Sequence, residues 1–334
     1  MKAAIFGAGS WGTAFAMVLA DAGTDVTLCA RRDEIVEAVN TAHENPWYQP
    51  GIKLPTQVRA TAEPAAALDG AQLAVLAVTA QTLRENLARW VPLLPGDALL
   101  VSLIKGVELG TTKRMSEVIR EVADVPSDRV AVVTGPNLAR EIAERRPSAA
   151  VVASSSPEQA KRLQSACQTP YFRPYTNTDV IGCELGGALK NVIALAVGMA
   201  DGMQLGDNAK ASLVTRGLAE TARLGVALGA DPMTFAGLAG LGDLVATCAS
   251  SLSRNHSVGE RLGKGMSVAE ALSATTTTAE GVASSKSILE LARKHDIDVP
   301  ITEVVVAVLY EHLRPSEGVT RLMTRATKPE RHGQ

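Results

Sequence analysis

The chain has 334 residues, of which 46% are hydrophobic and 20% are charged, and its formal net charge is −2. A near-neutral balance without a basic block argues against a nucleic-acid partner or a charged membrane surface, because neither field would be complemented. The length is sufficient for two globular domains.

The cysteines and the apolar runs indicate in which cellular compartment the protein is located. Cys29, Cys167, Cys183 and Cys248 are single and widely spaced, without C-x-x-C, zinc-ligand or disulfide-framework spacing, which indicates small buried side chains in a reducing compartment. The apolar run after Lys2 is broken at once by glycines and is no signal peptide. The longest apolar stretch, 192–200, is too short to span a bilayer. We expect a cytoplasmic protein without membrane insertion.

The first half of the chain alternates between short apolar runs and helical patterns. The runs lie at 3–6, 25–30, 71–78, 98–104, 130–134 and 149–154, and the helical patterns at 11–22, 32–42, 80–90, 112–122 and 157–166. Runs that are apolar on both faces suit strands of a parallel sheet covered by helices. The alternation predicts an α/β Rossmann-type doubly wound parallel sheet, which forms a dinucleotide-binding domain over residues 1–177.

The second half has almost no strand-like runs and predicts an all-α helical substrate domain over residues 178–326. Helical patterns lie at 180–200, 208–229, 232–238, 257–263, 267–272, 281–295 and 301–312. The threonine cluster at 275–278 predicts a loop. The polar tail, 327–334, is expected to be disordered.

A glycine-rich loop follows the first strand in the stretch IFGAGSWGTAFA, residues 5–16. Gly7 permits a tight turn, Gly9 lets the backbone approach a pyrophosphate, and Gly12 lets helix and strand pack closely. The free N–H groups and the dipole of the following helix favour an anion. A strand before the motif and a helix after it together predict a dinucleotide site.

Two arginines stand where the second strand ends. NAD-selective sites place a carboxylate there for the ribose 2′-OH, whereas this chain has Arg31 and Arg32. Guanidinium groups can pair with a 2′-phosphate, which favours NADP(H) and leaves NAD(H) as the alternative. The other interpretation is a solvated basic pair that is partnered by the neighbouring Asp33 and Glu34.

One lysine stands out in the apolar helical stretch 181–200. At helical spacing, Lys190 shares a face with small side chains, namely Cys183, Gly186, Gly187, Ala194, Val197 and Gly198. A ligand or another backbone can therefore come close to its ammonium. Partial burial would lower the lysine pKa from about 10.4 towards neutrality and suit the group to proton transfer. The alternative is a structural lysine that snorkels out of a packed helix.

Other polar groups stand where a pocket could collect them. Lys105 follows the run 98–104, at the carboxyl end of a strand, where open α/β sheets bind their ligands. Asp243 lies in an apolar, glycine-rich run. Ser253, Arg254 and Asn255 offer a hydroxyl, a guanidinium and an amide in succession, which suit a phosphate and adjacent hydroxyls. Taken singly, each of these residues is more often an ordinary loop residue.

Seven stretches resemble, in order and from end to end of the chain, the bacterial NAD(P)-dependent glycerol-3-phosphate dehydrogenase family. They are GAGSWGTA (7–14), IKG (104–106), GPNLAREI (135–142), GCELGGALKNVIALAVG (182–198), GLGDLVATC (240–248), SRN (253–255) and AEGV (279–282). The resemblance implies reversible reduction of dihydroxyacetone phosphate to sn-glycerol 3-phosphate by NAD(P)H. The product would supply phospholipid synthesis.

The resemblance also assigns roles to residues. By position, Lys190 matches the family's catalytic acid/base, with Lys105 stabilising developing charge and Asp243 holding Lys190 or a substrate hydroxyl. The substrate contacts are Lys105, Gly135, Asn137, Lys190, Asp243, Ser253, Arg254 and Asn255. The cofactor contacts are Gly7, Gly9, Ser10, Trp11, Gly12, Arg31, Arg32, Lys105, Ala139, Arg254, Thr278 and Glu280. Asn137 departs from the serine of many relatives.

The motifs imply no metal and leave two other functions open. The reaction needs no metal, and the five histidines, at 43, 256, 295, 312 and 332, are scattered. One alternative function is another two-domain dehydrogenase, acting on 3-hydroxy acids or 6-phosphogluconate, and a more distant one is a non-catalytic NADP(H) sensor. A helical domain of this kind is compatible with a homodimer.

Overall fold

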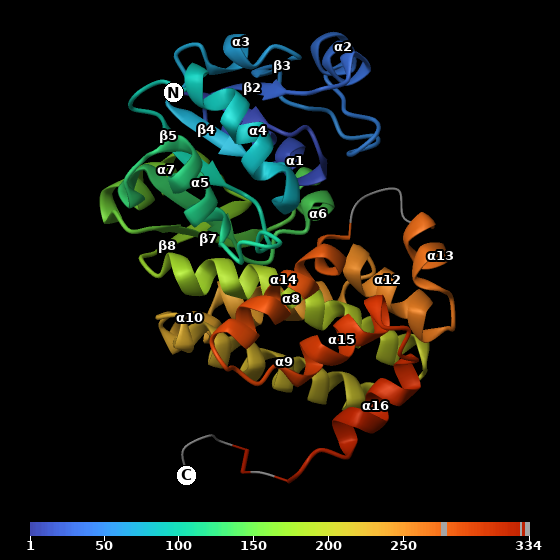
Figure 1. The fold of residues 1–334 in the computed structure, drawn as a ribbon. Helices are drawn as coiled ribbons and strands as arrows, with labels where there is room; N and C mark the ends of the chain where they lie inside the picture. The colour runs from blue at the N-terminus through green and yellow to red at the C-terminus, as the bar shows by residue number, and fades with distance from the viewer. Residues whose placement is uncertain (275–278, 328, 331–334) are drawn as a thin grey trace.

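The computed structural model describes residues 1–274, 279–327 and 329–330, with a strand-rich first part and an all-helical second part (Figure 1). The described strands are β1 (Lys2–Phe6), β2 (Asp25–Cys29), β3 (Val58–Thr61), β4 (Leu73–Leu76), β5 (Leu99–Ser102), β6 (Val130–Thr134), β7 (Ser148–Ser154) and β8 (Phe172–Asn177). They form one sheet in the order β3-β2-β1-β4-β5-β6-β7-β8. All neighbouring strands run parallel except β6 and β7, which are antiparallel.

Helices cover both faces of the sheet because its strands are apolar on both sides. In β1, Ile5 belongs to the core that includes α1 (Ser10–Asp21) and α7 (Pro157–Cys167), whereas Phe6 belongs to the core of α3 (Pro64–Leu68), α4 (Leu83–Trp90) and α5 (Met115–Ala123). This alternation follows from the two-residue period of a strand. The shorter α6 (Ala139–Ala143) packs beside α1, and α2 (Asp33–Ala42) follows β2.

The second part is built around α8 (Val180–Gly202), which is buried along most of its length. Around it pack α9 (Asp207–Ala227), α10 (Pro232–Ala236), α11 (Asp243–Ala249), α12 (Arg254–Gly263), α14 (Glu280–Lys294) and α15 (Pro300–Tyr310), while α13 (Val268–Ser273) and α16 (Pro315–Met323) lie further out (Figure 1).

The central helix corrects one expectation about apolar length. By length and mean hydropathy α8 could span a bilayer, and within the described residues it is the one helix that could. However, 83% of its most apolar window is buried inside the fold, as is usual for the core helix of a globular domain. Its hydropathy therefore serves packing in this structure.

The predicted Rossmann-type sheet and helical second part are confirmed, with differences in detail. All six predicted strands are present, but β3 and β8 were missed, as were α3, α6, α11 and α16. The two missed strands are the edges of the sheet, where one side of the strand is solvated and the apolar signal is weak. The predicted loop at 275–278 lies outside the described residues, as does most of the tail.

All four cysteines are free thiols. Burial raises the pKa of Cys167 and of Cys248 to about 12, so neither is a reactive thiolate near neutral pH. Cys183 is also fully buried, and Cys29 is half-buried. The expectation that the cysteines act as packing residues fits this environment.

Candidate active site

The glycine-rich loop has the backbone shape that a dinucleotide site requires. Gly7 has φ +115°, and a Cβ there would lie 2.5 Å from the carbonyl oxygen of Ala77. A Cβ on Gly12 would lie 2.0 Å from the carbonyl oxygen of Gly7, so only glycine lets α1 start this close to β1. Gly9 faces open space at the N-terminus of α1, where backbone N–H groups favour an anion. These residues fit a dinucleotide pyrophosphate.

The two arginines after β2 lie at the expected position, next to the start of α2. Both are exposed, and within the described residues neither makes an ion pair with Asp33 or Glu34. Those two acidic residues lie in the first turn of α2, where they complement the helix dipole. The basic pair is therefore not neutralised by its sequence neighbours.

Two lysines converge on one buried aspartate. Lys190 Nζ donates to Asp243 Oδ1 at 2.5 Å and to Thr247 Oγ1 at 2.7 Å. Lys105 Nζ donates to the other carboxylate oxygen of Asp243 at 2.5 Å and to the carbonyl oxygen of Gly135 at 3.0 Å. The Asp243 side chain is 1% exposed. An ammonium has three N–H groups, so each lysine keeps one for a further acceptor.

The charges of this cluster do not cancel. When both lysines are protonated, two ammonium groups face one carboxylate, which leaves excess positive charge in a largely buried site. Burial, opposed by Asp243 and reinforced by the nearby Lys190 charge, lowers the pKa of Lys105 to about 7. An anionic substrate would balance the charge.

Local backbone structure brings the three charged side chains together. Lys105 follows β5, Lys190 lies in the middle of α8, and Asp243 begins α11 directly after a π-helical turn at Leu238–Gly242. Turns of this type are frequent at functional sites. A Cβ on Gly187 would lie 2.9 Å from Thr134 Oγ1, so glycine at this position lets the end of β6 lie against α8 beside Lys105.

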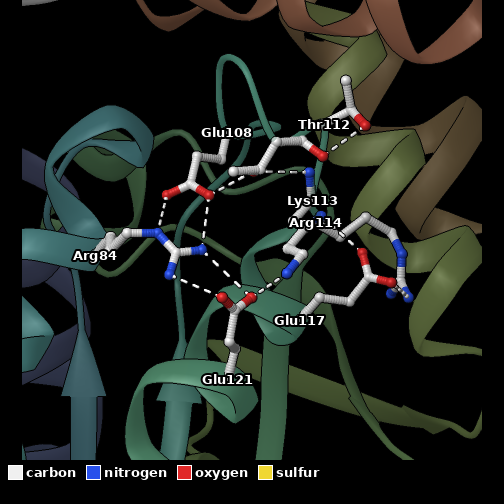
Figure 2. A network of polar contacts seen from close by, with 8 residues as sticks. Arg84, Glu108, Thr112, Lys113, Arg114, Glu117 and Glu121 are labelled. Atoms are coloured by element: carbon white, nitrogen blue, oxygen red, sulfur yellow. Dashed lines mark hydrogen bonds and ion pairs between the residues drawn. The ribbon is translucent and has the colours of Figure 1, made fainter.

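A polar network fixes the segment that follows Lys105 (Figure 2). Arg84 holds both carboxylate oxygens of Glu108 at 2.9 Å and also pairs with Glu121 at 3.1 Å. Lys113 pairs with the same Glu121. The segment is closed by a backbone bridge between residues 107 and 114. These ion pairs and the backbone bridge therefore hold the segment that follows Lys105 in a fixed conformation.

Asn255 and Ser253, expected to contact substrate, also have structural partners. Ser253 Oγ caps α12 by accepting from the backbone N–H of His256 at 3.3 Å. Asn255 Nδ2 donates to Asn191 Oδ1 at 3.0 Å, and Asn255 Oδ1 accepts from the N–H of Gly281 at 3.0 Å. The amide of Asn255 thus connects α8, α12 and the start of α14.

The remaining predicted contacts lie at the starts of four helices. Arg254 opens α12, and Glu280 opens α14 close enough to interact with it electrostatically. Ser10 and Trp11 begin α1, and Ala139 begins α6, which packs against α1. Thr278 lies outside the described residues.

Asn137 has the environment of a ligand-contacting residue. It follows Gly135, whose carbonyl oxygen accepts from Lys105, and both polar atoms of its amide are buried without a hydrogen-bond partner in the described structure. Thr134, at the end of β6, likewise has a buried hydroxyl without a partner there. Buried polar groups are normally paired, so these two positions fit a polar ligand beside Lys105.

The sequence reasoning missed two polar residues of this region. Thr247 lies four residues after Asp243, on the same face of α11, and this spacing could have signalled it. Glu184 lies on α8 and binds Arg114 and Ser116 across the two halves of the chain. Within the described residues, no group of three or more His, Cys, Asp or Glu side chains is placed to hold a metal ion.

The chain is similar to known dehydrogenases along both of its halves. Residues 2–160 match the family model described as NAD-dependent glycerol-3-phosphate dehydrogenase N-terminus, and residues 179–320 match the model of its C-terminus. The chain is 65% identical over 331 residues to glycerol-3-phosphate dehydrogenase [NAD(P)+] of Streptomyces griseus, covering 99% of this chain and 98% of that one.

A solved structure gives the same result. The crystal structure of glycerol-3-phosphate dehydrogenase from Coxiella burnetii has a TM-score of 0.92 and 38% identity, and the match covers 97% of this chain and 99% of that one. Sequence and fold thus agree along nearly the whole chain. We conclude that the chain belongs to the NAD-dependent glycerol-3-phosphate dehydrogenase family.

Proposed function

We propose that this protein interconverts dihydroxyacetone phosphate and sn-glycerol 3-phosphate with NAD(P)(H), and so supplies glycerol 3-phosphate for phospholipid synthesis. The observation that carries the proposal is the pair of lysines on Asp243, because each ammonium keeps one N–H for a substrate oxygen. Family membership supports the same substrate. When bound, the dinucleotide supplies or accepts the hydride.

Lys190 is the proposed acid/base. In the direction of reduction its ammonium gives a proton to the oxygen of the substrate carbonyl, while Asp243 and Thr247 fix the position of Nζ. Lys105 donates to the same developing negative charge from the other side of Asp243. In the reverse direction Lys190 takes the proton from the hydroxyl.

The substrate phosphate is assigned to the start of α12. Arg254 supplies the positive charge, with Ser253 and Asn255 beside it, and Asn137 contributes an amide from the loop after β6. Fixing the phosphate there would orient the carbonyl towards the lysines. We propose Gly135 as a backbone contact next to Lys105.

We propose NADP(H) as the preferred cofactor and NAD(H) as the weaker one. The glycine loop, with Ser10, Trp11 and Ala139 around it, would hold the pyrophosphate, and Glu280 would lie near the nicotinamide end. Arg31 and Arg32, which make no ion pair with Asp33 or Glu34 in the described part of the chain, suit a ribose 2′-phosphate.

The domain division, the location and the assembly are also proposals. We assign residues 1–177 to the cofactor domain and 178–326 to the substrate domain, which fits the end of β8 at Asn177 and the start of α8 at Val180. Four free thiols suit the cytoplasm. Light scattering of the purified chain would test a homodimer, which predicts twice the chain mass.

The test of the function is a substrate screen. Oxidation of NADPH is followed with dihydroxyacetone phosphate, with dihydroxyacetone and with 2- and 3-keto acids. The proposal expects turnover with the phosphate ester and at least about tenfold lower kcat/KM without the phosphate, since a buried charged contact is lost. Turnover only with a keto acid would indicate the other dehydrogenases, and NADPH binding without any turnover would indicate a sensor.

A further inference from the structure

The short turn Asn45–Gln49 contacts two separate parts of the cofactor site. It follows α2 and is closed by hydrogen bonds from the N–H groups of Tyr48 and Gln49 to the carbonyl oxygen of Asn45. We propose that this turn positions both the glycine loop and Arg32, and that Trp47 thereby sets part of the preference for NADP(H). The inference rests on the proposed role of Arg32 in cofactor binding.

Two buried amides of the turn hold the glycine loop from behind. Asn45, which is fully buried, donates through Nδ2 to the carbonyl oxygen of Ala8 and to Thr13 Oγ1, both at 2.9 Å. Gln49, 1% exposed, donates through Nε2 to the carbonyl oxygen of Ser10 at 3.1 Å. The hydroxyl of Ser10 in turn donates to the carbonyl oxygen of Tyr48 at 3.3 Å.

These bonds occupy carbonyl oxygens of the loop that the pyrophosphate would approach. A carbonyl group fixed on one side of a peptide plane also fixes the direction of the N–H on the other side. The orientation of the loop's N–H groups towards a phosphate therefore depends on Asn45 and Gln49. Because NADPH and NADH share the pyrophosphate, this support serves both cofactors equally.

The middle of the same turn supports Arg32. The guanidinium carbon of Arg32 lies 5.3 Å from the centre of the Trp47 ring and 5.5 Å from the centre of the Tyr48 ring. Contacts of this kind hold a guanidinium in place and leave its N–H groups available for an anion. Within the described residues, neither Asp33 nor Glu34 forms an ion pair with the Arg32 guanidinium. Only NADPH has a 2′-phosphate that this support would serve.

The two halves of the turn therefore predict different effects on the two cofactors. Removing the Gln49 amide should weaken the binding of NADPH and of NADH by the same factor. Removing the Trp47 ring should weaken NADPH alone. Trp47 is 47% exposed, so replacing it does not open a cavity in the core.

The experiment measures dissociation constants of NADPH and NADH by calorimetry with the full-length protein. The variants are Gln49→Met, which keeps side-chain volume, Trp47→Leu, Arg32→Gln and the double variant Trp47→Leu/Arg32→Gln. Tyr175→Leu is the matched control, because Tyr175 is an exposed ring that packs on Arg173 on the distant strand β8. Trp47→Phe keeps an aromatic ring and should restore NADPH affinity.

We expect Trp47→Leu to weaken NADPH about three- to fivefold, with NADH within about twofold of the wild type. We expect this effect to vanish in the Arg32→Gln background, since a coupled pair is not additive. Gln49→Met should weaken both cofactors about tenfold. The control should match the wild type.

The contrary results distinguish a failure of the Trp47 inference from a failure of the proposed cofactor preference. If Arg32→Gln weakens NADPH but Trp47→Leu acts equally in both backgrounds, the turn does not act through Arg32 and the inference is wrong, while the proposed cofactor preference stands. If Arg32→Gln leaves NADPH binding unchanged, both are wrong. Unchanged binding in Gln49→Met would overturn the support of the glycine loop.

Discussion

Lys190 donates to Thr247 as well as to Asp243, and the threonine hydroxyl is the one neutral acceptor in that pair of contacts. Thr247→Val keeps the shape of this buried side chain and removes the acceptor. A hydrogen bond to a charged group is worth about 1.5–3 kcal/mol, so we expect kcat to fall about tenfold or more while the Kd for NADPH is unchanged. Thr247→Ser should recover most of the rate. A wild-type kcat in the valine variant would show that Thr247 does not position Lys190.

Lys105 gives the reaction a pH dependence. Burial lowers its pKa to about 7, so the side chain is an ammonium below pH 7 and loses its proton as the pH rises through that value. With the proton, Lys105 also loses its charge and part of its hydrogen-bonding capacity towards an anionic substrate. We therefore expect kcat/KM for dihydroxyacetone phosphate to decline above about pH 7, by up to tenfold per pH unit.

The control for this profile is Lys105→Arg, because arginine stays charged throughout the range. Its rate can be lower at every pH, but the decline near pH 7 should be absent. We would measure kcat/KM of both proteins between pH 6 and pH 9. The ionisation of the substrate phosphate affects both profiles equally, so a difference between them reports the titration of Lys105. A wild-type profile without this decline, or the same decline in the arginine variant, would contradict the assignment.

At the scale of elements, α8 is joined to the sheet domain through Glu184. Its carboxylate accepts from the N–H of Ser116 at 2.7 Å, from Ser116 Oγ at 2.6 Å and from Arg114 Nη1 at 2.6 Å. It therefore caps the first turn of α5 from the other half of the chain. Since Lys190 lies on the same helix as Glu184, this contact also fixes Lys190 relative to Lys105.

Removing this carboxylate should reduce stability. Glu184→Ala leaves Arg114, a largely buried cation, without its buried partner, and we expect the free energy of unfolding to fall by about 3–5 kcal/mol in urea titration. The matched control is Glu85→Ala, which breaks the exposed Arg89–Glu85 pair and should change stability by less than about 1 kcal/mol. Equal effects of the two substitutions would contradict a structural role for Glu184.

The position of each strand in the sheet and the length of each helix decided which elements could be predicted from the sequence. The inner strands are apolar on both faces and appear in the sequence as continuous runs. The edge strands do not: β3 exposes Arg59, and β8 contains Pro174 and exposes Arg173 and Tyr175. The missed helices α3 and α6 have five residues each, too few to show a helical period.

At the scale of the whole molecule, the site depends on the packing of two halves of the chain. Lys105 and Asp243 are 138 residues apart in the sequence, and no local pattern shows that they meet. The glycine loop was predictable because its function lies in a short continuous segment. The small residues that share a helix face with Lys190 were predictable from their spacing. The contact of Lys190 with Thr247, and the contacts of Glu184 with Arg114 and Ser116, depend on tertiary packing.

The proposed function depends on Lys190, held by Asp243, moving the proton in the reduction of dihydroxyacetone phosphate. The most direct measurement is the initial rate of NADPH oxidation with this substrate for the wild type and for Lys190→Ala, with the Kd for NADPH determined for both. We expect a kcat lower by about 10² or more in the variant, with NADPH binding unchanged. A variant that binds NADPH and turns over like the wild type would contradict it.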